Sequence, residues 1–215
     1  QLWNNDYSVD PKVWDFSIGW LPSQYAKPYM MKSWEMPNPY TVVCQLREDI
    51  YWQNIAPANG RQFVASDVVA HYNRLFGKGG QPISAYYTSV TAWVPLISIV
   101  ADGKFKVTFN WTPGTSGFNI LTTMQAQGAD NSIECPEAVA AQTSASSPYM
   151  VDWRKAVGCG PFILTDFVDA SSATYKANPN YWGKDLRWPD NKLPYIDELK
   201  LQIIVSNTTA EAAFR

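Results

Sequence analysis

The chain has 215 residues and a formal net charge of −2, from 17 basic and 19 acidic residues. These charges are scattered singly, so the basic stripe that nucleic-acid binding requires is missing and we expect no nucleic-acid partner. No window approaches the roughly 20 consecutive apolar residues of a membrane-spanning helix. The length suffices for one good-sized hydrophobic core or two small ones.

The first third of the chain predicts a loop, a hairpin and a helix. Residues 1–32 mix Trp, Pro, Ser and Tyr without a sustained period, which is typical of a long loop laid over a surface. The β-branched run 41–46 and the run 50–52, separated by a charged turn, predict a hairpin-like pair. Apolar residues recur at helical spacing from 66 to 76, and Ser66 and Asp67 favour the start of that helix.

The middle of the chain predicts a second hairpin and a short helix. Asp102 and Gly103 form a turn signal between 96–101 and 104–111, and the alternation of Phe105, Val107 and Phe109 with polar residues predicts that one face of the second strand is buried. Pro136 opens a short Ala-rich helix, which gives way to a small-residue loop by Pro148.

The C-terminal quarter predicts a strand-rich unit. We expect Gly158 and Gly160 to relieve Cβ clashes at a tight turn, followed by a hairpin of 162–168 with 173–177. Asn178-Pro179 stops the second strand, and the pair Tyr181-Trp182 is expected to cover the sheet edge before Gly183 releases the chain. Residues 199–205 predict a strand that enters the interior. Strands outnumber helices without strict alternation, which indicates an α+β fold with mixed sheets.

Catalytic and metal-binding patterns are missing from the sequence. The only histidine, His71, falls within the predicted helix, and we expect it at the surface or at the boundary of the core. A Ser-His-Asp mechanism would need that histidine at its centre. Paired carboxylates such as Asp197-Glu198 are commoner as solvated turn residues than as a glycosidase pair. No Cys/His spacing suits zinc and no acidic loop suits calcium, so we expect no enzyme activity, no metal and no cofactor.

Three sequence blocks, in order, carry a family resemblance. They are SWEMP with VVCQLREDIYW (33–37 and 42–52), GRQFVASDVV (60–69), and the set VGCGPF, NPNYWG and LPYIDEL (157–162, 178–183 and 193–199). Together they resemble the extracellular solute-binding proteins of family 5, the peptide-type receptors of bacterial ABC importers. One block alone would be weak evidence, whereas three in order make a strong match.

The resemblance implies part of a periplasmic-binding-protein-like class II lobe with its inserted subdomain, an α+β (mixed α/β) fold with few helices. Residues 1–156 would be the N-terminal loop and inserted subdomain, and 157–215 the return to the main lobe, truncated at the C-terminus. Family members are more than twice as long, so we interpret the chain as a fragment that lacks the second lobe. Because it starts at Gln1 without a signal stretch, we expect that any export signal has been removed.

The resemblance also implies capture rather than conversion of a small solute. The protein would be periplasmic or extracellular, associated with the membrane through the transporter and a possible lipid anchor outside this chain. It would hold an oligopeptide, or in some branches a sugar or nickel complex, for the transmembrane subunits of an ABC permease. The residues that would line its cleft are Tyr86, Tyr87, Trp93, Trp20 and Gln127. For each of them the alternative is a purely structural role.

Three cysteines allow at most one disulfide. Cys44 lies in a strand-like run, and we interpret it as a small buried hydrophobe. An exported protein would allow a bridge between Cys135 and Cys159, but the sequence does not place their Cα atoms.

Two rival interpretations stay open. The ten Trp and twelve Tyr also suit a carbohydrate-binding receptor or module that stacks sugars on aromatic rings, which quenching of tryptophan fluorescence by oligosaccharides would reveal. A hydrolase fragment would lose activity in an Asp or Glu to Ala series. Neither interpretation explains the ordered blocks, and we rank the importer receptor first.

Overall fold

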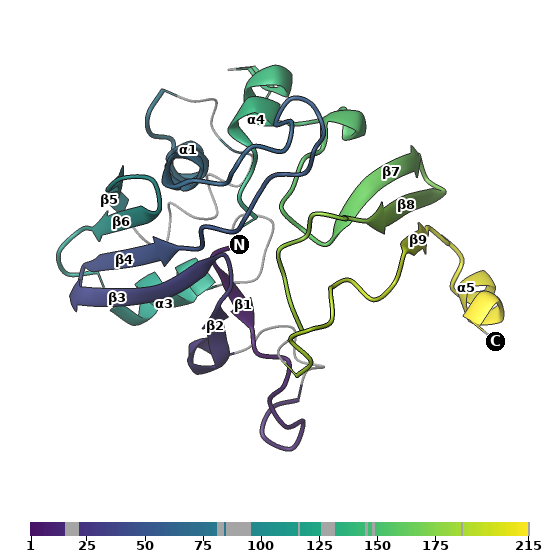
Figure 1. The fold of residues 1–215 in the computed structure, drawn as a ribbon, viewed down its shortest axis with the longest axis horizontal. Helices are drawn as coiled ribbons and strands as arrows, with labels where there is room; N and C mark the ends of the chain where they lie inside the picture. Colours follow the sequence, from purple (N-terminus) through teal and green to yellow (C-terminus); the bar gives the residue numbers. More distant parts are fainter. Residues whose placement is uncertain are drawn as a thin grey trace.

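The computed structural model describes residues 1–15, 22–80, 84, 96–115, 117–125, 132–144, 146–147, 149–185 and 187–214. Within these residues the chain forms three antiparallel sheets and a few short helices, which confirms the predicted α+β fold class (Figure 1). The strands are β1 (Trp3–Asn5), β2 (Ala26–Pro28), β3 (Met31–Asn38), β4 (Thr41–Leu46), β5 (Leu96–Ala101), β6 (Lys106–Trp111), β7 (Phe162–Val168), β8 (Ser172–Ala177) and β9 (Glu198–Gln202). The helices are η1 (Ser23–Tyr25), α1 (Ala65–Leu75), α3 (Gly117–Gln125), α4 (Pro136–Gln142), η3 (Trp153–Lys155) and α5 (Asn207–Phe214).

The largest sheet has the order β3-β4-β6-β5. Its first hairpin differs from the prediction, because β4 pairs with the preceding β3 rather than with residues 50–52. The turn of this hairpin therefore lies before β4, between β3 and β4, where the side chain of Asn38 accepts a hydrogen bond from the amide of Tyr40 (2.9 Å). Residues 50–52 form no strand, and only Tyr51 makes a single bridge, to Gln62. The β5–β6 hairpin is confirmed.

The main core lies between this sheet and α1. On β6, Val107 and Phe109 are fully buried, so the predicted alternation does define a buried face. Tyr72 of α1 packs edge to face on Phe109, with ring centroids 5.0 Å apart. Such aromatic contacts contribute about 0.5–1.5 kcal/mol beyond the burial of apolar area.

The N-terminal segment is more ordered than the predicted surface loop. Residues 3–5 and 26–28 pair as β1 and β2, and Leu2 and Trp3 are buried in the core. The ring of Trp3 packs edge to face on Trp34 of β3, with centroids 6.1 Å apart. The prediction was wrong because it relied on hydrophobic periodicity, which this segment lacks. The segment is buried by a sheet whose residues come later in the sequence.

The third sheet, with the order β7-β8-β9, confirms the hairpin of 162–168 with 173–177. The strand expected to enter the interior ends at residue 202, and most of its side chains are exposed, so that prediction was wrong. Apolar alternation alone does not reveal whether anything covers a strand. Among the described helices, none has the length and apolar character required to cross a membrane.

Gly158 and Gly160 do not have the role that we predicted. Neither residue has a positive φ, and a Cβ at Gly160 would meet no atom within 4 Å. At Gly183, by contrast, a Cβ would overlap the ring of Tyr181. The close approach that requires glycine therefore lies at the end of this region and not at its start.

Candidate functional site

The residues predicted to line a ligand cleft all lie outside the described part of the chain: Trp20, Tyr86, Tyr87, Trp93 and Gln127. Their contact with a ligand therefore stays a prediction. Ser84, just before the two tyrosines in sequence, is described and buried. Its amide donates a hydrogen bond to the carbonyl of Arg74 (3.1 Å), which fixes this point of the chain to the last turn of α1.

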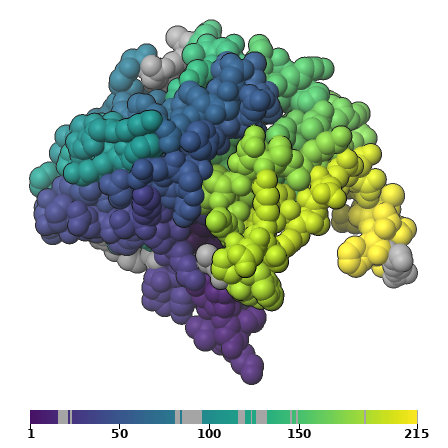
Figure 2. Space-filling view, viewed as in Figure 1, coloured from purple at the N-terminus to yellow at the C-terminus, as the bar shows by residue number. Residues whose placement is uncertain are grey.

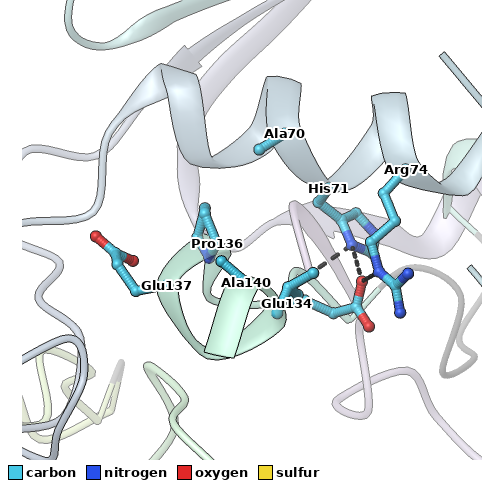
Figure 3. Close-up of a pocket in the computed structure, with 8 residues that line it drawn as sticks. Ala70, His71, Arg74, Glu134, Pro136, Glu137 and Ala140 are labelled. Atoms are coloured by element: carbon cyan, nitrogen blue, oxygen red, sulfur yellow. Dashed lines mark hydrogen bonds and ion pairs between the residues drawn. The ribbon is translucent and has the colours of Figure 1, made fainter. Parts of the chain in front are cut away.

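A pocket of about 320 Å³ opens between α1 and the segment that enters α4. Helix α4 starts here because Pro136 stands at its first turn, where the missing N–H of proline costs no hydrogen bond. Figure 3 shows Glu137 at one end of the pocket, Glu134 with two α1 side chains at the other, and small apolar residues between them. The lining residues are Ala70, His71, Arg74, Glu134, Pro136, Glu137, Val139 and Ala140.

At one end of the pocket, Glu134 contacts two buried side chains of α1. Its Oε2 atom lies 3.0 Å from Nε of Arg74 and 3.4 Å from Nδ1 of His71. Burial raises the pKa of the Glu134 carboxyl, but hydrogen bonding to His71 and the charge of Arg74 outweigh burial and leave this pKa below its usual value. His71 is 3% exposed, so its predicted position at the surface or at the boundary of the core was wrong. Helical spacing alone did not reveal the later segment that covers it.

At the other end, Arg61 joins α1 to α4 through two carboxylates. Its guanidinium donates to both oxygens of Asp67 (2.8 and 2.9 Å) and to both oxygens of Glu137 (2.5 and 2.6 Å). Asp67 is buried and also accepts hydrogen bonds from the Trp52 indole (3.0 Å) and from the amide of Val64 (3.0 Å) at the start of α1. The Arg61 guanidinium lowers the pKa of Glu137 to about 2.

The charges around the pocket are therefore largely paired with one another. Such an arrangement is suited to holding α4 against α1. The Cys135 thiol donates a hydrogen bond to Oε2 of Glu137 (3.2 Å), but burial raises the pKa of this thiol to about 11, so it is a poor nucleophile. The described residues also include no group of three or more His, Cys, Asp or Glu side chains placed to hold a metal ion. The pocket is a structural joint, and its chemistry does not identify a cargo.

The three cysteines are free thiols in this structure, so the considered bridge between Cys135 and Cys159 is not formed. Burial raises the pKa of all three thiols, that of Cys135 to about 11. Cys44 is fully buried on β4, as its interpretation as a small hydrophobe predicts. Thiols with raised pKa values are poor nucleophiles, because the thiolate is the reactive form.

A second cluster joins the C-terminal quarter to the main sheet. Tyr29 and Tyr181 share a hydrogen bond between their hydroxyls (2.7 Å), and the ring of Trp182 lies 4.9 Å from that of Tyr29. The guanidinium of Arg47 lies over Trp182, 4.9 Å from the ring centroid. Tyr181 and Trp182 therefore contact the residues that precede β3 and follow β4, and the Trp182 indole also donates to the carbonyl of Cys159, shortly before β7 (3.1 Å).

Gln53 completes this junction. Its side-chain nitrogen donates to the carbonyl of Phe162 (2.7 Å), its side-chain oxygen accepts from the amide of Gly158 (3.1 Å), and its backbone amide donates to the Gly158 carbonyl (2.9 Å). Sequence reasoning missed both Gln53 and Arg61. The contacts of Gln53 with Gly158 and Phe162, and of Arg61 with Glu137, join residues 76 to 109 positions apart, so no local spacing marks them. Only Asp67, six residues after Arg61, is a near partner in sequence.

The comparison by sequence assigns the chain to a family. The family model for "Bacterial extracellular solute-binding proteins, family 5 Middle" matches residues 26–215, and the chain belongs to this family. The predicted family is thus confirmed. It is a family of binding proteins and not of enzymes, as expected.

Among individual relatives, the chain is 25% identical to heme-binding protein A of Haemophilus influenzae over 86% of this chain and 33% of the relative. The structure is similar to periplasmic binding protein DppA of Helicobacter pylori in complex with the peptide STSA (TM-score 0.66, 20% identity, 87% of this chain and 36% of that one). It is also similar to MoaA of A. tumefaciens R10 in complex with mannopinic acid (TM-score 0.67, 19% identity, 91% and 34%). The chain spans about a third of the length of these proteins.

Proposed function

We propose that this chain is part of the substrate-binding component of an ABC importer. The protein captures a small solute in the periplasm or outside the cell and delivers it to the membrane permease. The observation that carries the proposal is the family match over residues 26–215. The described residues are compatible with it: they pack aromatic residues and ion pairs into a scaffold, and they contain no group of His, Cys, Asp or Glu placed to hold a metal ion.

An oligopeptide is the cargo we favour. The proteins of similar structure from H. pylori and from Bacillus subtilis were solved with peptides bound. A peptide site needs aromatic walls and hydrogen-bond donors in a cleft that closes between two lobes. Tyr86 and Tyr87 are the side chains that we propose for the wall, with Trp93, Trp20 and Gln127 as further contacts.

Heme is the second candidate, because a heme-binding protein of Haemophilus influenzae is a relative at 25% identity. Haem iron is commonly held by a histidine, cysteine, methionine or tyrosine side chain. The single histidine of this chain lines the pocket between α1 and α4, where its Nδ1 atom lies 3.4 Å from Glu134, and it is not one of the predicted cleft residues. A heme site would therefore need an iron-coordinating side chain other than His71, or it would bind heme without any side chain coordinated to the iron.

Native mass spectrometry of the complete gene product, purified gently so that captured cargo is retained, tests the cargo, with the released mass fragmented and the absorbance spectrum recorded. A ladder of peptide masses supports the proposal. A hexose-spaced mass indicates the carbohydrate alternative, and a Soret band indicates heme; either result overturns the peptide assignment. Recovery of no small solute from a folded protein, under conditions that retain cargo in a known receptor, contradicts the capture function itself.

Tyr86→Ala with Tyr87→Ala then tests the proposed wall. We expect the double variant to lose at least tenfold in affinity for the recovered cargo, because stacking area and hydroxyl contacts disappear together. Trp188→Ala is the matched control, since Trp188 is an exposed aromatic residue on a loop outside the predicted cleft. Equal affinities of the wild-type protein, the double variant and Trp188→Ala would show that the two tyrosines do not contact the cargo.

A further inference from the structure

Two of the three cysteine thiols share the cluster of charged side chains around Arg61. The Cys135 thiol donates a hydrogen bond to Oε2 of Glu137 (3.2 Å), and the same carboxylate accepts two hydrogen bonds from Arg61. The Cys159 thiol interacts electrostatically with Asp67 and Arg61 of this cluster and with Cys135 itself. The two sulfur atoms are therefore neighbours in space, although α4 and η3 separate them in the sequence.

The backbone that carries Cys159 is also fixed beside this cluster. The side-chain oxygen of Gln53 accepts from the amide of Gly158 (3.1 Å), and the amide of Gln53 donates to the Gly158 carbonyl (2.9 Å). Trp52, the residue before Gln53, donates its indole N–H to Asp67 (3.0 Å). Figure 2 shows the C-terminal quarter, in green, lying against the blue segment that precedes α1. Because Gly158 directly precedes Cys159, these bonds hold Cys159 next to the cluster.

The third thiol has a different setting. Cys44 lies on β4 inside the main sheet, paired in register with Trp34 of β3 and Val107 of β6. Cys135 and Cys159 lie outside the strands and helices, the first at the cap of α4 and the second in the bend before β7. A disulfide requires a Cα separation of about 4.4–6.8 Å. Any adjustment towards that separation falls on irregular backbone and leaves the sheets and α1 in place.

We propose that Cys135 and Cys159, which are free thiols in this structure, form a disulfide bond when a disulfide oxidant reaches the folded protein. The compartment of this extracellular family supplies such oxidants. The bond fastens the start of α4 to the bend before β7, across the junction that Gln53 and Arg61 hold by hydrogen bonds. The inference rests on the proposed export of the protein but on no particular cargo.

The reaction is a thiol–disulfide exchange in two steps. Cys159 is only partly buried, so its thiolate meets the oxidant first, attacks one sulfur of the oxidant's disulfide and releases the other as a thiolate. The Cys135 thiolate then attacks Sγ of Cys159 in this mixed disulfide and releases the second sulfur of the oxidant. The two cysteines lose two electrons and two protons in total, and the oxidant gains both and becomes two thiols.

The surroundings of the two thiols set the rate of this exchange. Burial raises the pKa of Cys159 and that of Cys135, the latter to about 11, so little thiolate is present and the bond forms slowly. Thiolates with a raised pKa are also poor leaving groups, so the bond resists reduction once it has formed. These properties favour a lasting structural link over a rapid redox switch.

Peptide mapping without reduction tests the proposal on the complete gene product. Trypsin separates the three thiols, because Cys44 falls in fragment 33–47, Cys135 in 107–154 and Cys159 in 156–176. Purified reduced protein is treated with oxidised glutathione, the remaining thiols are alkylated in denaturant, and the digest is weighed. We expect 107–154 to be linked to 156–176, with a mass two hydrogens below their sum, while 33–47 carries the alkyl group.

Alkylation of both Cys135 and Cys159 overturns the proposal. So does a link from either residue to Cys44, to glutathione alone or to a cysteine outside residues 1–215. The same map of protein recovered from its source cells tests export separately. A link that forms with glutathione but is missing in the cells supports the pair and contradicts the proposed location, so the two failures are distinguishable.

Urea denaturation provides a second measurement. We expect Cys159→Ala to lower the urea midpoint at least twice as much in oxidised protein as in protein kept reduced with a phosphine, because only the oxidised wild type carries the bond. Cys44→Ala is the matched control: it removes a buried thiol but no bond, so its effect should be the same in both states. An effect of Cys159→Ala that is independent of the reductant contradicts the proposal. If the variant fails to fold, the wild-type midpoint should fall on reduction, and an unchanged midpoint is the contrary result.

Discussion

Where the C-terminal quarter meets the rest of the chain, side-chain contacts rather than backbone preference determine which residue type a position tolerates. Gly183 illustrates this, because a side chain there would overlap the ring of Tyr181. That ring cannot move aside freely, since its hydroxyl is hydrogen-bonded to Tyr29 and its centroid lies 5.4 Å from that of the Trp182 ring. Gly160 occupies the same region without any such neighbour.

Gly183→Ala should therefore lower the free energy of unfolding by about 1–3 kcal/mol, the usual cost of overpacking. Gly160→Ala is the matched control and should be neutral or stabilising by up to about 1 kcal/mol, because alanine reduces the entropy of the unfolded chain. Urea denaturation followed by tryptophan fluorescence measures both. Equal stabilities of the two variants would show that the Tyr181 ring yields at little cost.

Ion pairs connect α1 with α4 and with the residues just before it. Arg61 bridges Asp67 of α1 and Glu137 of α4, and Arg74 with His71 reaches Glu134 just before α4. The pKa of Glu137 falls from 4.5 to about 2 in the folded protein. A lowered folded-state pKa means that the pairing stabilises the fold fully above about pH 4.5 and that this contribution is lost as the pH falls towards 2.

The free energy of unfolding should consequently decrease as the pH falls from about 4.5 to 2. The Glu137→Gln variant should lose less stability over this range, because glutamine has no charge that protonation could remove. Solvent screens the partly exposed Glu137 pair, so we expect a difference of no more than about 1 kcal/mol. Urea midpoints at pH 7, 4.5 and 3 measure it. Glu35→Gln, at an exposed position on β3, should keep the wild-type profile; parallel profiles for all three proteins would contradict a role for the pair.

At the scale of the whole molecule, residues 1–215 contain a well-packed core and an incomplete periphery. The main sheet, α1 and the N-terminal strands bury their apolar residues in one cluster, whereas the C-terminal sheet leaves one face partly open. The matched relatives are about three times as long as this chain. A cleft between two lobes requires contacts from both.

Residues 1–215 should therefore fold but bind ligand only weakly. We expect a dissociation constant above about 1 μM for any oligopeptide, which corresponds to a binding free energy no more favourable than about −8 kcal/mol. Isothermal titration calorimetry with the recovered cargo measures it. Tighter binding by this chain alone would show that the described lobe holds a complete site.

Local sequence patterns were sufficient to predict several elements. The helix at 65–75, the short helix after Pro136 and the hairpins 96–111 and 162–177 follow from apolar periodicity, turn residues and helix caps, which act over a few residues. The ordered blocks also predicted the family. The five proposed cleft residues lie outside the described structure, so that part of the prediction is not tested.

The sequence by itself determined α1, α4 and the hairpins β5–β6 and β7–β8, because hydrogen bonding between near neighbours and alternation of apolar residues are local properties. It did not determine β1 and β2, whose residues have no local period. Only the tertiary structure decided which segments meet: that β4 pairs with β3, that Trp3 and His71 are buried, and that Gln53 and Arg61 join distant parts of the chain. These contacts join residues far apart in the sequence. Their energies depend on desolvation and on exact distances, which no local pattern records.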